Sequence, residues 1–258
     1  MIQQDDLADA LGRLTNQGDK DIFGAALERA QTLDPSTRDM IEYGLSMAGL
    51  SPSDLAYQQH LYPFDPPASA ADMAKTQSGC GLTTEAIWRA GKVADARLRL
   101  PYGPRSVAGG VLYAVSLEKA IAQHHGAWFD ASRTGFAAFE PGDAPIIGCK
   151  GCPGLWARNT FTDEHEFTVL YVEDDGVTVH SLDGGQPGIA IRTRRVVFVP
   201  EHKEIWMASL DATVERDGRP SKGRRLLGIT RSVLLLRELD TEPPPSPSPS
   251  PSLEQGTP

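Results

Sequence analysis

The chain has 258 residues, of which 40% are hydrophobic and 23% charged, which is ordinary for a globular protein. No apolar run approaches the roughly 18 residues that a membrane-spanning helix needs, so we expect no membrane partner. The net charge of −9 argues against general nucleic-acid binding.

Charge is unevenly distributed along the chain. Residues 1–60 carry ten acidic and four basic side chains, whereas residues 188–237 carry eleven basic and five acidic ones. Two solvated faces that attract each other explain this pattern, and so does a basic surface for an anionic polymer. The sequence leaves both interpretations open.

The first six residues, Met1–Asp6, are acidic and lack the apolar core of a secretory signal. We therefore expect the protein to be cytoplasmic as synthesised. Any exit would follow cell lysis, or delivery by a phage or injection particle.

Residues 1–60 have the periodicity of amphipathic helices and contain no chemical motif. Asp34–Thr37 starts one of these helices, with a proline near its first turn, and Gly49 ends it. The segment predicts three or four helices. The proline-rich stretch His60–Pro67 breaks the helical pattern and marks a joint.

A cysteine opens the next predicted helix, which ends at Gly91. Its apolar face consists of Leu82, Ala86, Ile87 and Ala90. Ser78 is the candidate N-cap, and small residues surround Cys80. The positive end of the helix dipole favours a thiolate there, so Cys80 is a candidate nucleophile. A small buried hydrophobe is the alternative explanation for a lone cysteine.

Another helix is predicted over residues 107–125, and the pattern then changes from helical to alternating. Strands are predicted at residues 135–139, 144–148, 165–172, 177–182, 189–199 and 204–210. Asp174–Gly176 is a hairpin signal. Helices first and antiparallel strands afterwards predict an α+β fold. Residues 211–230 are polar and rich in glycine and arginine, and Val214–Asp217 with Arg219–Pro220 indicates an exposed turn.

Two polar residues in the predicted hairpin complete a possible catalytic group. His165 begins one strand and Asp183 ends the next, so the two side chains come within reach across the ladder. A carboxylate there can orient the imidazole, and Cys80 supplies the thiol. Thiol, imidazole and acid are the components of a cysteine hydrolase. A structural histidine and a turn-forming aspartate explain the same two residues.

Several segments in order resemble the NlpC class of papain-like cell-wall peptidases. These segments are Cys80–Thr83, Ile87–Gly91, Leu100–Tyr102, Pro141–Asp143 and the strand that His165 begins. Asp183–Gln186 is similar to the acid-Gly-Asn segment of the related CHAP amidases. The resemblance covers about residues 70–210. It implies a papain-like α+β fold, in which the nucleophile helix packs on an antiparallel β-sheet.

The resemblance also implies roles for individual residues. Cys80 would attack an amide carbonyl, His165 would take the thiol proton, and Asp183 would hold the imidazole. Gln186 is an alternative orienting residue. The backbone N–H of Cys80 would bind the oxyanion, with the side chain of Gln77 as a possible second donor. We expect no metal and no cofactor.

The implied activity is hydrolysis of an amide bond in peptidoglycan, as an endopeptidase or an amidase. The chain departs from the family at Gly81, where the family has serine, at Glu166, and in a longer loop 148–162. A catalytically inactive papain-like binding or scaffold protein is therefore an alternative. A cysteine transferase or deamidase that acts on a protein is another. The sequence does not predict the oligomeric state.

The remaining cysteines form a single C-x-x-C, Cys149 and Cys152. One such pair lacks the second pair of a structural zinc site, and Pro153 follows instead of a helix. We interpret it as a loop, with metal or redox use as the alternative. Trp156 in the same loop either lines a substrate groove or packs inside the protein.

The predicted organisation has four parts. Residues 1–60 are a helical N-terminal extension, and residues 68–210 are the papain-like hydrolase domain. Residues 211–240 are a basic C-terminal extension. Residues 241–258 are rich in proline and serine, cannot bury a core, and are expected to form a disordered tail.

Overall fold

The computed structural model describes residues 4–61, 80–91, 128–131, 138–148, 165–185 and 188–232. These residues combine helices with an antiparallel sheet, so the predicted α+β class is confirmed. The helix predicted over residues 107–125, most of the proline-rich joint and the Pro/Ser tail lie outside the described residues.

Helices α1 (Gln4–Arg13), α2 (Gln17–Ala30), α3 (Pro35–Ser46) and α4 (Leu55–Leu61) form the predicted N-terminal segment. Short polar side chains start two of them. Asn16 Oδ1 accepts a hydrogen bond from the backbone N–H of Asp19 at 2.7 Å, and Asp34 Oδ1 accepts one from that of Thr37 at 3.0 Å. The Asp34–Thr37 helix start is therefore confirmed.

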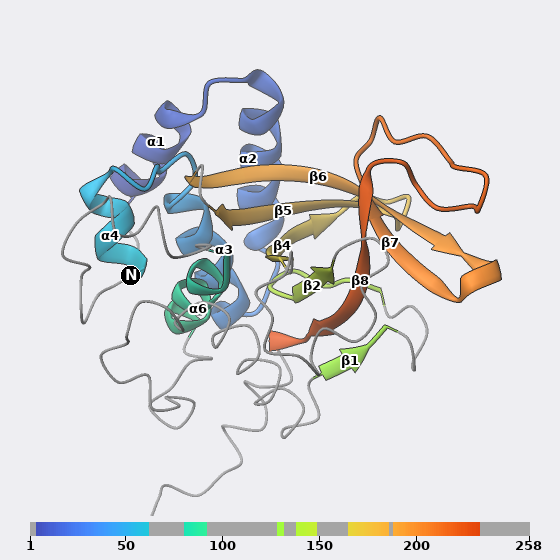
Figure 1. Cartoon of the computed structure of the whole chain (residues 1–258). Helices are drawn as coiled ribbons and strands as arrows, with labels where there is room; N and C mark the ends of the chain where they lie inside the picture. Colours follow the sequence, from blue (N-terminus) through green and yellow to red (C-terminus); the bar gives the residue numbers. More distant parts are fainter. Residues whose placement is uncertain are drawn as a thin grey trace, which may run out of the picture.

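Helix α6 (Cys80–Ala90) is confirmed, with Cys80 in its first turn and Gly91 directly after its last residue. Ser78, the candidate N-cap, lies outside the described residues. It packs against α3 and α4 on one side and against the strands β3 (His165–Glu166) and β5 (Thr178–Gly185) on the other. Figure 1 shows α6 beside α3.

The sheet also contains β1 (Trp128–Asp130), β2 (Ala144–Gly148), β4 (Thr168–Val172), β6 (Gly188–Val199), β7 (Glu204–Ala208) and β8 (Gly223–Thr230). Hydrogen bonding gives the order β3-β2-β8-β7-β6-β5-β4, with β1 paired to β8. The hairpin at Asp174–Gly176 joins β4 to β5, as predicted.

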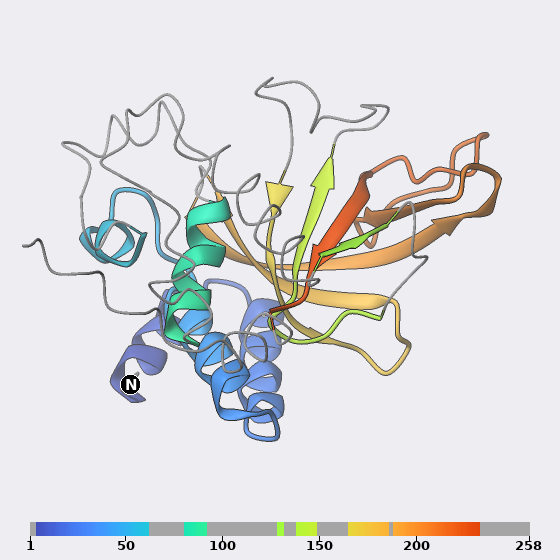
Figure 2. The same cartoon turned by 90° about the horizontal axis from the view of Figure 1, so that it is seen from below.

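The sheet nearly closes on itself. β3 and β4 lie at opposite ends of the strand order, yet only Phe167 separates them in sequence. The backbone N–H of Val169, in β4, donates to the carbonyl of Asp143 just before β2, at 2.9 Å. One interrupted strand thus bonds to both ends of the sheet and curls it towards a barrel (Figure 2).

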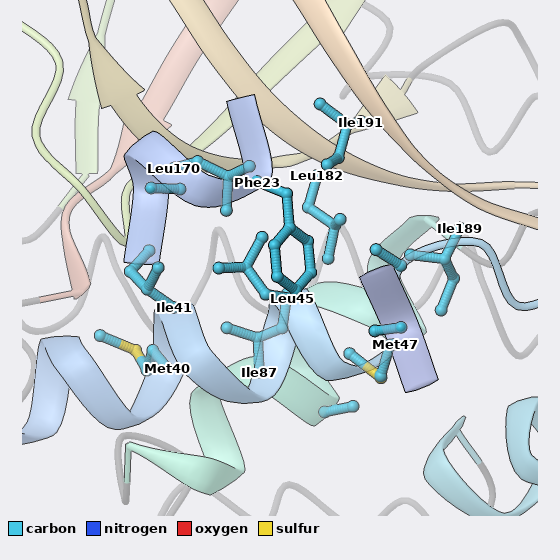
Figure 3. Packing of buried hydrophobic residues seen from close by; sticks show 14 of the residues in the cluster. Phe23, Met40, Ile41, Leu45, Met47, Ile87, Leu170, Leu182, Ile189 and Ile191 are labelled. Atoms are coloured by element: carbon cyan, nitrogen blue, oxygen red, sulfur yellow. The ribbon is translucent and has the colours of Figure 1, made fainter. Parts of the chain in front are cut away.

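Two hydrophobic cores lie on the two faces of this curled sheet. Because successive residues of a strand point to opposite faces, Val169 joins one core and Leu170 the other. The core of Leu170 lies between the sheet and the helices. Figure 3 shows Phe23 and Leu45 there, packed with Ile87 of α6 and Leu182 of β5.

Three features differ from the prediction. β1 was not predicted, and Ala138 and Phe139, at the end of a predicted strand, lie in irregular backbone. No strand was predicted in residues 211–230, but residues 223–230 form β8, which pairs with β2, β7 and β1. The turn predicted within residues 214–220 is present, and residues 214–217 are exposed. Burial of Leu226 and Ile229 against the second core favours the strand.

The predicted boundaries also divide structures that the molecule keeps together. Residues of α1, α2 and α3 share one buried core with α6, β4, β5 and β6. A domain that ends at residue 210 would lack β8, which lies inside the strand order. None of the helices in the described ranges is long and apolar enough to cross a bilayer.

Candidate active site

The packing of α6 fixes the position of Cys80. Gly44 of α3 leaves room for α6: a Cβ on Gly44 would lie 3.2 Å from Cδ1 of Ile87. At the other end of α6, a Cβ on Gly91 would lie 2.3 Å from Cγ of Met40. These two close contacts with α3 therefore fix the position of α6, which also contacts β3 and β5.

His165 and Asp183 come from strands that the sheet closure brings together. His165 begins β3 and pairs with Ile147 of β2, whereas Asp183 lies near the end of β5 and pairs with Ala190 of β6. Nε2 of His165 donates to Oδ2 of Asp183 at 2.6 Å. The structure therefore brings together the two residues that the sequence singled out. The predicted strand 165–172 is divided at Phe167, however, so His165 lies in β3, outside the β4–β5 hairpin.

Cys80 is the third member of this group. His165 also forms a hydrogen bond with the Cys80 side chain. Because Asp183 occupies Nε2, Nδ1 is the ring nitrogen left for the sulfur. A thiol, an imidazole and a carboxylate thus form one connected chain across α6, β3 and β5.

The surroundings of His165 favour its protonated form. Burial alone would lower the pKa of the imidazole. The hydrogen bonds to Asp183 and Cys80, together with the charges of both groups, outweigh burial and raise the pKa to about 9. An imidazolium beside a sulfur is the condition that stabilises a thiolate near neutral pH.

Asp183 accepts hydrogen bonds on both carboxylate oxygens. Oδ1 accepts from Oγ of Ser181 at 2.7 Å and from Nη1 of Arg194 at 3.0 Å, and Oδ2 accepts from Nη2 of Arg194 and from His165. Burial would raise the pKa of this carboxyl, but Arg194 and His165 hold it well below its usual range. Asp183 is therefore ionised at neutral pH.

The three groups differ in how far they reach the surface. Cys80 is only 1% exposed, and the Asp183 side chain is 8% exposed. The His165 side chain keeps 21% of its surface accessible. Solvent therefore meets this group at the imidazole, and the sulfur and carboxylate lie behind it.

A tyrosine of α4 lies within electrostatic range of the sulfur. Tyr57 is buried, and burial together with the charge of Cys80 raises its pKa to about 12. Its hydroxyl is therefore protonated, and thus a hydrogen-bond donor, across the pH range in which a thiolate would form.

Sequence reasoning did not find Arg194, Ser181 or Tyr57. Arg194 is one of eleven basic residues in the basic segment 188–237. The register of the β5–β6 hairpin is the signal that singles it out, because Arg194, Ser181 and Asp183 lie on the same face of these two strands. Nothing in the sequence around Tyr57 indicated a functional role.

Gln77, Gln186 and Trp156, the predicted oxyanion and substrate residues, lie outside the described residues, as do Cys149 and Cys152. Within the described ranges, no group of three or more His, Cys, Asp and Glu side chains could hold a metal ion.

Comparisons of this chain with protein-family models, curated proteins and solved structures found no match. The sequence motifs and the geometry of the site are therefore the basis for a functional proposal.

Proposed function

We propose that this protein is a papain-like cysteine hydrolase that cleaves an amide bond in peptidoglycan. The observation that carries the proposal is the connected chain Cys80–His165–Asp183. A cysteine hydrolase requires a nucleophile, a base and an orienting acid in hydrogen-bond contact, and here they come from α6, β3 and β5. The choice of peptidoglycan depends on the sequence motifs shared with cell-wall peptidases.

In the proposed mechanism, the Cys80 thiol gives its proton to His165, and the thiolate attacks the amide carbonyl carbon. His165 then returns the proton to the leaving amine, and a thioester remains on Cys80. Water attacks the thioester while His165 accepts its proton, which releases the carboxylic acid and restores the thiol. The sum of the steps is one amide and one water converted to one amine and one acid.

The N-terminal turn of α6 supports the charged intermediate. The first N–H groups of a helix have no partner within the helix, and their dipoles favour negative charge. Cys80 lies at this end of α6, so its backbone N–H is the natural donor to the oxyanion of the tetrahedral intermediate.

The test is incubation of the protein with purified peptidoglycan, beside Cys80→Ala and His165→Gln. We expect new free amines without new reducing sugars from the wild type, and none from either variant. The matched control is the double variant Cys149→Ser/Cys152→Ser, which keeps Cys80 as the chain's one cysteine and should remain active. Equal amine release from wild type and Cys80→Ala, or none from either, contradicts the proposal.

A further inference from the structure

We infer that Arg194 is a positioning residue of the proposed hydrolase site: it holds Asp183 against His165 and balances the charge of that carboxylate. Asp183 then orients the imidazole while the group as a whole stays electrically neutral. This inference depends on the thiol–imidazole pair of the proposed function.

The contacts of Arg194 are those of a two-point clamp. Nη1 donates to Oδ1 of Asp183 at 3.0 Å, and Nη2 donates to Oδ2, the oxygen that also accepts from His165. Nη1 also donates to Oγ of Ser181 at 2.6 Å, and Ser181 donates to Oδ1 at 2.7 Å. With both oxygens engaged, the carboxylate cannot turn away from His165.

The position of the guanidinium is fixed as well. In the β5–β6 ladder Arg194 pairs with Val179, so its side chain passes Ser181 to reach Asp183. Its guanidinium carbon lies 4.4 Å from the centre of the ring of Phe167, the residue that separates β3 from β4. Stacking and hydrogen bonding together leave the side chain only 15% exposed.

Charge balance explains why a buried site would use this clamp. Transfer of a proton from Cys80 to His165 creates one negative and one positive charge. Asp183 alone would add a net negative charge, which disfavours a thiolate in a poorly solvated site. Arg194 cancels that charge, so the group is neutral before and after the transfer.

The other ionisable groups near the site come from neighbouring elements. Tyr57 of α4 lies within electrostatic range of Cys80 and is neutral, because burial and the charge of Cys80 raise its pKa to about 12. Glu166 follows His165 in β3 and is buried, and as the next residue in the strand it points to the other face of the sheet. Among the described residues, Cys80 and Asp183 are the charged groups that shift the pKa of His165, and Arg194 acts on Asp183.

A purely structural role for Arg194 is the competing explanation. The test must therefore measure the effect of the Arg194 charge on Cys80, not a change in protein stability. The measured quantity is the midpoint of Cys80 thiolate formation, followed by absorbance near 240 nm as a function of pH. All variants carry Cys149→Ser/Cys152→Ser, and the Cys80→Ala form of each variant is subtracted to remove the tyrosine signal. The measurement needs no substrate and no reagent access to the sulfur.

Four variants give a pattern that a structural role does not produce. Arg194→Gln should raise the thiolate midpoint by about one pH unit, because the Asp183 charge is no longer balanced. Asp183→Asn should lower the midpoint by a similar amount, because Arg194 is left unbalanced. The double variant Asp183→Asn/Arg194→Gln should return to within about 0.3 pH unit of wild type. Arg194→Lys keeps the charge and should rescue the midpoint.

The matched control is Arg219→Gln. Arg219 also makes a two-point pair, with Glu204 at 2.9 and 3.2 Å, and its guanidinium lies 5.9 Å from the centre of the Trp206 ring. Its loss should leave the Cys80 midpoint unchanged.

Arg194→Gln leaves a buried carboxylate unpaired and can fail to fold. The test then compares Asp183→Asn with the double variant. The double variant must have the higher thiolate midpoint, because it lacks the unbalanced positive charge of Arg194. Equal midpoints for those two variants, or an unchanged midpoint in folded Arg194→Gln, overturn the inference. A protein that shows the expected midpoints but releases no amine from peptidoglycan contradicts the proposed function alone.

Discussion

His165 is the residue on which the chemistry of this site converges. It joins a carboxylate of β5 to a thiol at the start of α6, and those contacts raise its pKa to about 9 against the effect of burial. At neutral pH the imidazole is therefore protonated and able to donate to a leaving amine. For the proposed hydrolysis we therefore expect activity to fall as the pH rises through about 9, because His165 then loses that proton.

The raised pKa also makes a prediction about stability. A histidine that binds its proton more tightly when folded stabilises the protein fully below its unfolded pKa of about 6.5, and this contribution is lost as the pH rises through about 9. Proton loss from the Cys80 thiol would change the stability with pH in the opposite direction. The test therefore uses Cys80→Ala, in which Asp183 still raises the pKa of His165. Between pH 6 and 9.5, urea unfolding should show an additional stability loss on the order of 1 kcal/mol relative to Cys80→Ala/His165→Gln. Parallel pH profiles for the two variants would contradict this prediction.

At the residue scale, the sequence predicted the three reactive groups but not their support. Cys80, His165 and Asp183 stood at a helix start and at two strand ends, which are positions that local patterns reveal. Arg194 looks like any solvated arginine in a basic segment. Its role depends on strand register, which the chain's local pattern does not contain.

At the element scale, the position of α6 depends on close contact with α3. Gly91 ends α6 as predicted, but its small size has a second consequence. A Cβ there would lie 2.3 Å from Cγ of Met40 and 2.8 Å from the backbone oxygen of Ser36, and backbone cannot easily move aside. The contact of α6 with α3 is therefore tight at the C-terminal end of α6.

We predict that Gly91→Ala destabilises the protein by about 2 kcal/mol, because the methyl group overpacks the α3–α6 contact. The same substitution in α2, Gly24→Ala, meets no atom within 4 Å and should be neutral or stabilising by up to about 1 kcal/mol. Chemical denaturation of both variants checks this contrast. Equal stability of the two would show that α6 is not seated as described.

Elements with a clear period were predictable, and those with a mixed environment were not. α6 has apolar residues at helical spacing, and β6 is a long strand next to a glycine-rich turn. β8 begins with Gly223, Arg224 and Arg225 and becomes fully buried only towards its end, so it lacks a regular alternation. Its strand conformation comes from partners that are distant in sequence, β2 and β7.

At the scale of the whole molecule, closure of the sheet and the shared core make the parts interdependent. Phe23 and Leu45, from the predicted extension, lie in the same core as Ile87 and Leu182. Local periodicity predicted those helices but could not show what covers them. The helices carry the apolar surface that the outer face of the sheet and α6 require (Figure 3).

We therefore predict that a chain beginning at residue 62 does not fold, because removal of α1–α4 exposes this core. A chain ending at residue 210 should also fail, because β8 is lost from inside the strand order. A chain of residues 1–240, which lacks only the predicted Pro/Ser tail, is the control and should unfold cooperatively like the full chain. Circular dichroism during heating distinguishes these outcomes, and a cooperative transition in either of the first two chains would contradict the prediction.

The most direct measurement of the central claim is the alkylation rate of Cys80 by iodoacetamide at pH 6, in the Cys149→Ser/Cys152→Ser background with and without His165→Gln. An isolated thiol is almost fully protonated at this pH and reacts slowly, whereas a thiol paired with an imidazolium is a thiolate. We predict that His165→Gln slows carboxamidomethylation of Cys80 by at least about 10-fold. Equal rates with and without His165 would show that the imidazole does not activate the sulfur, and would contradict the account.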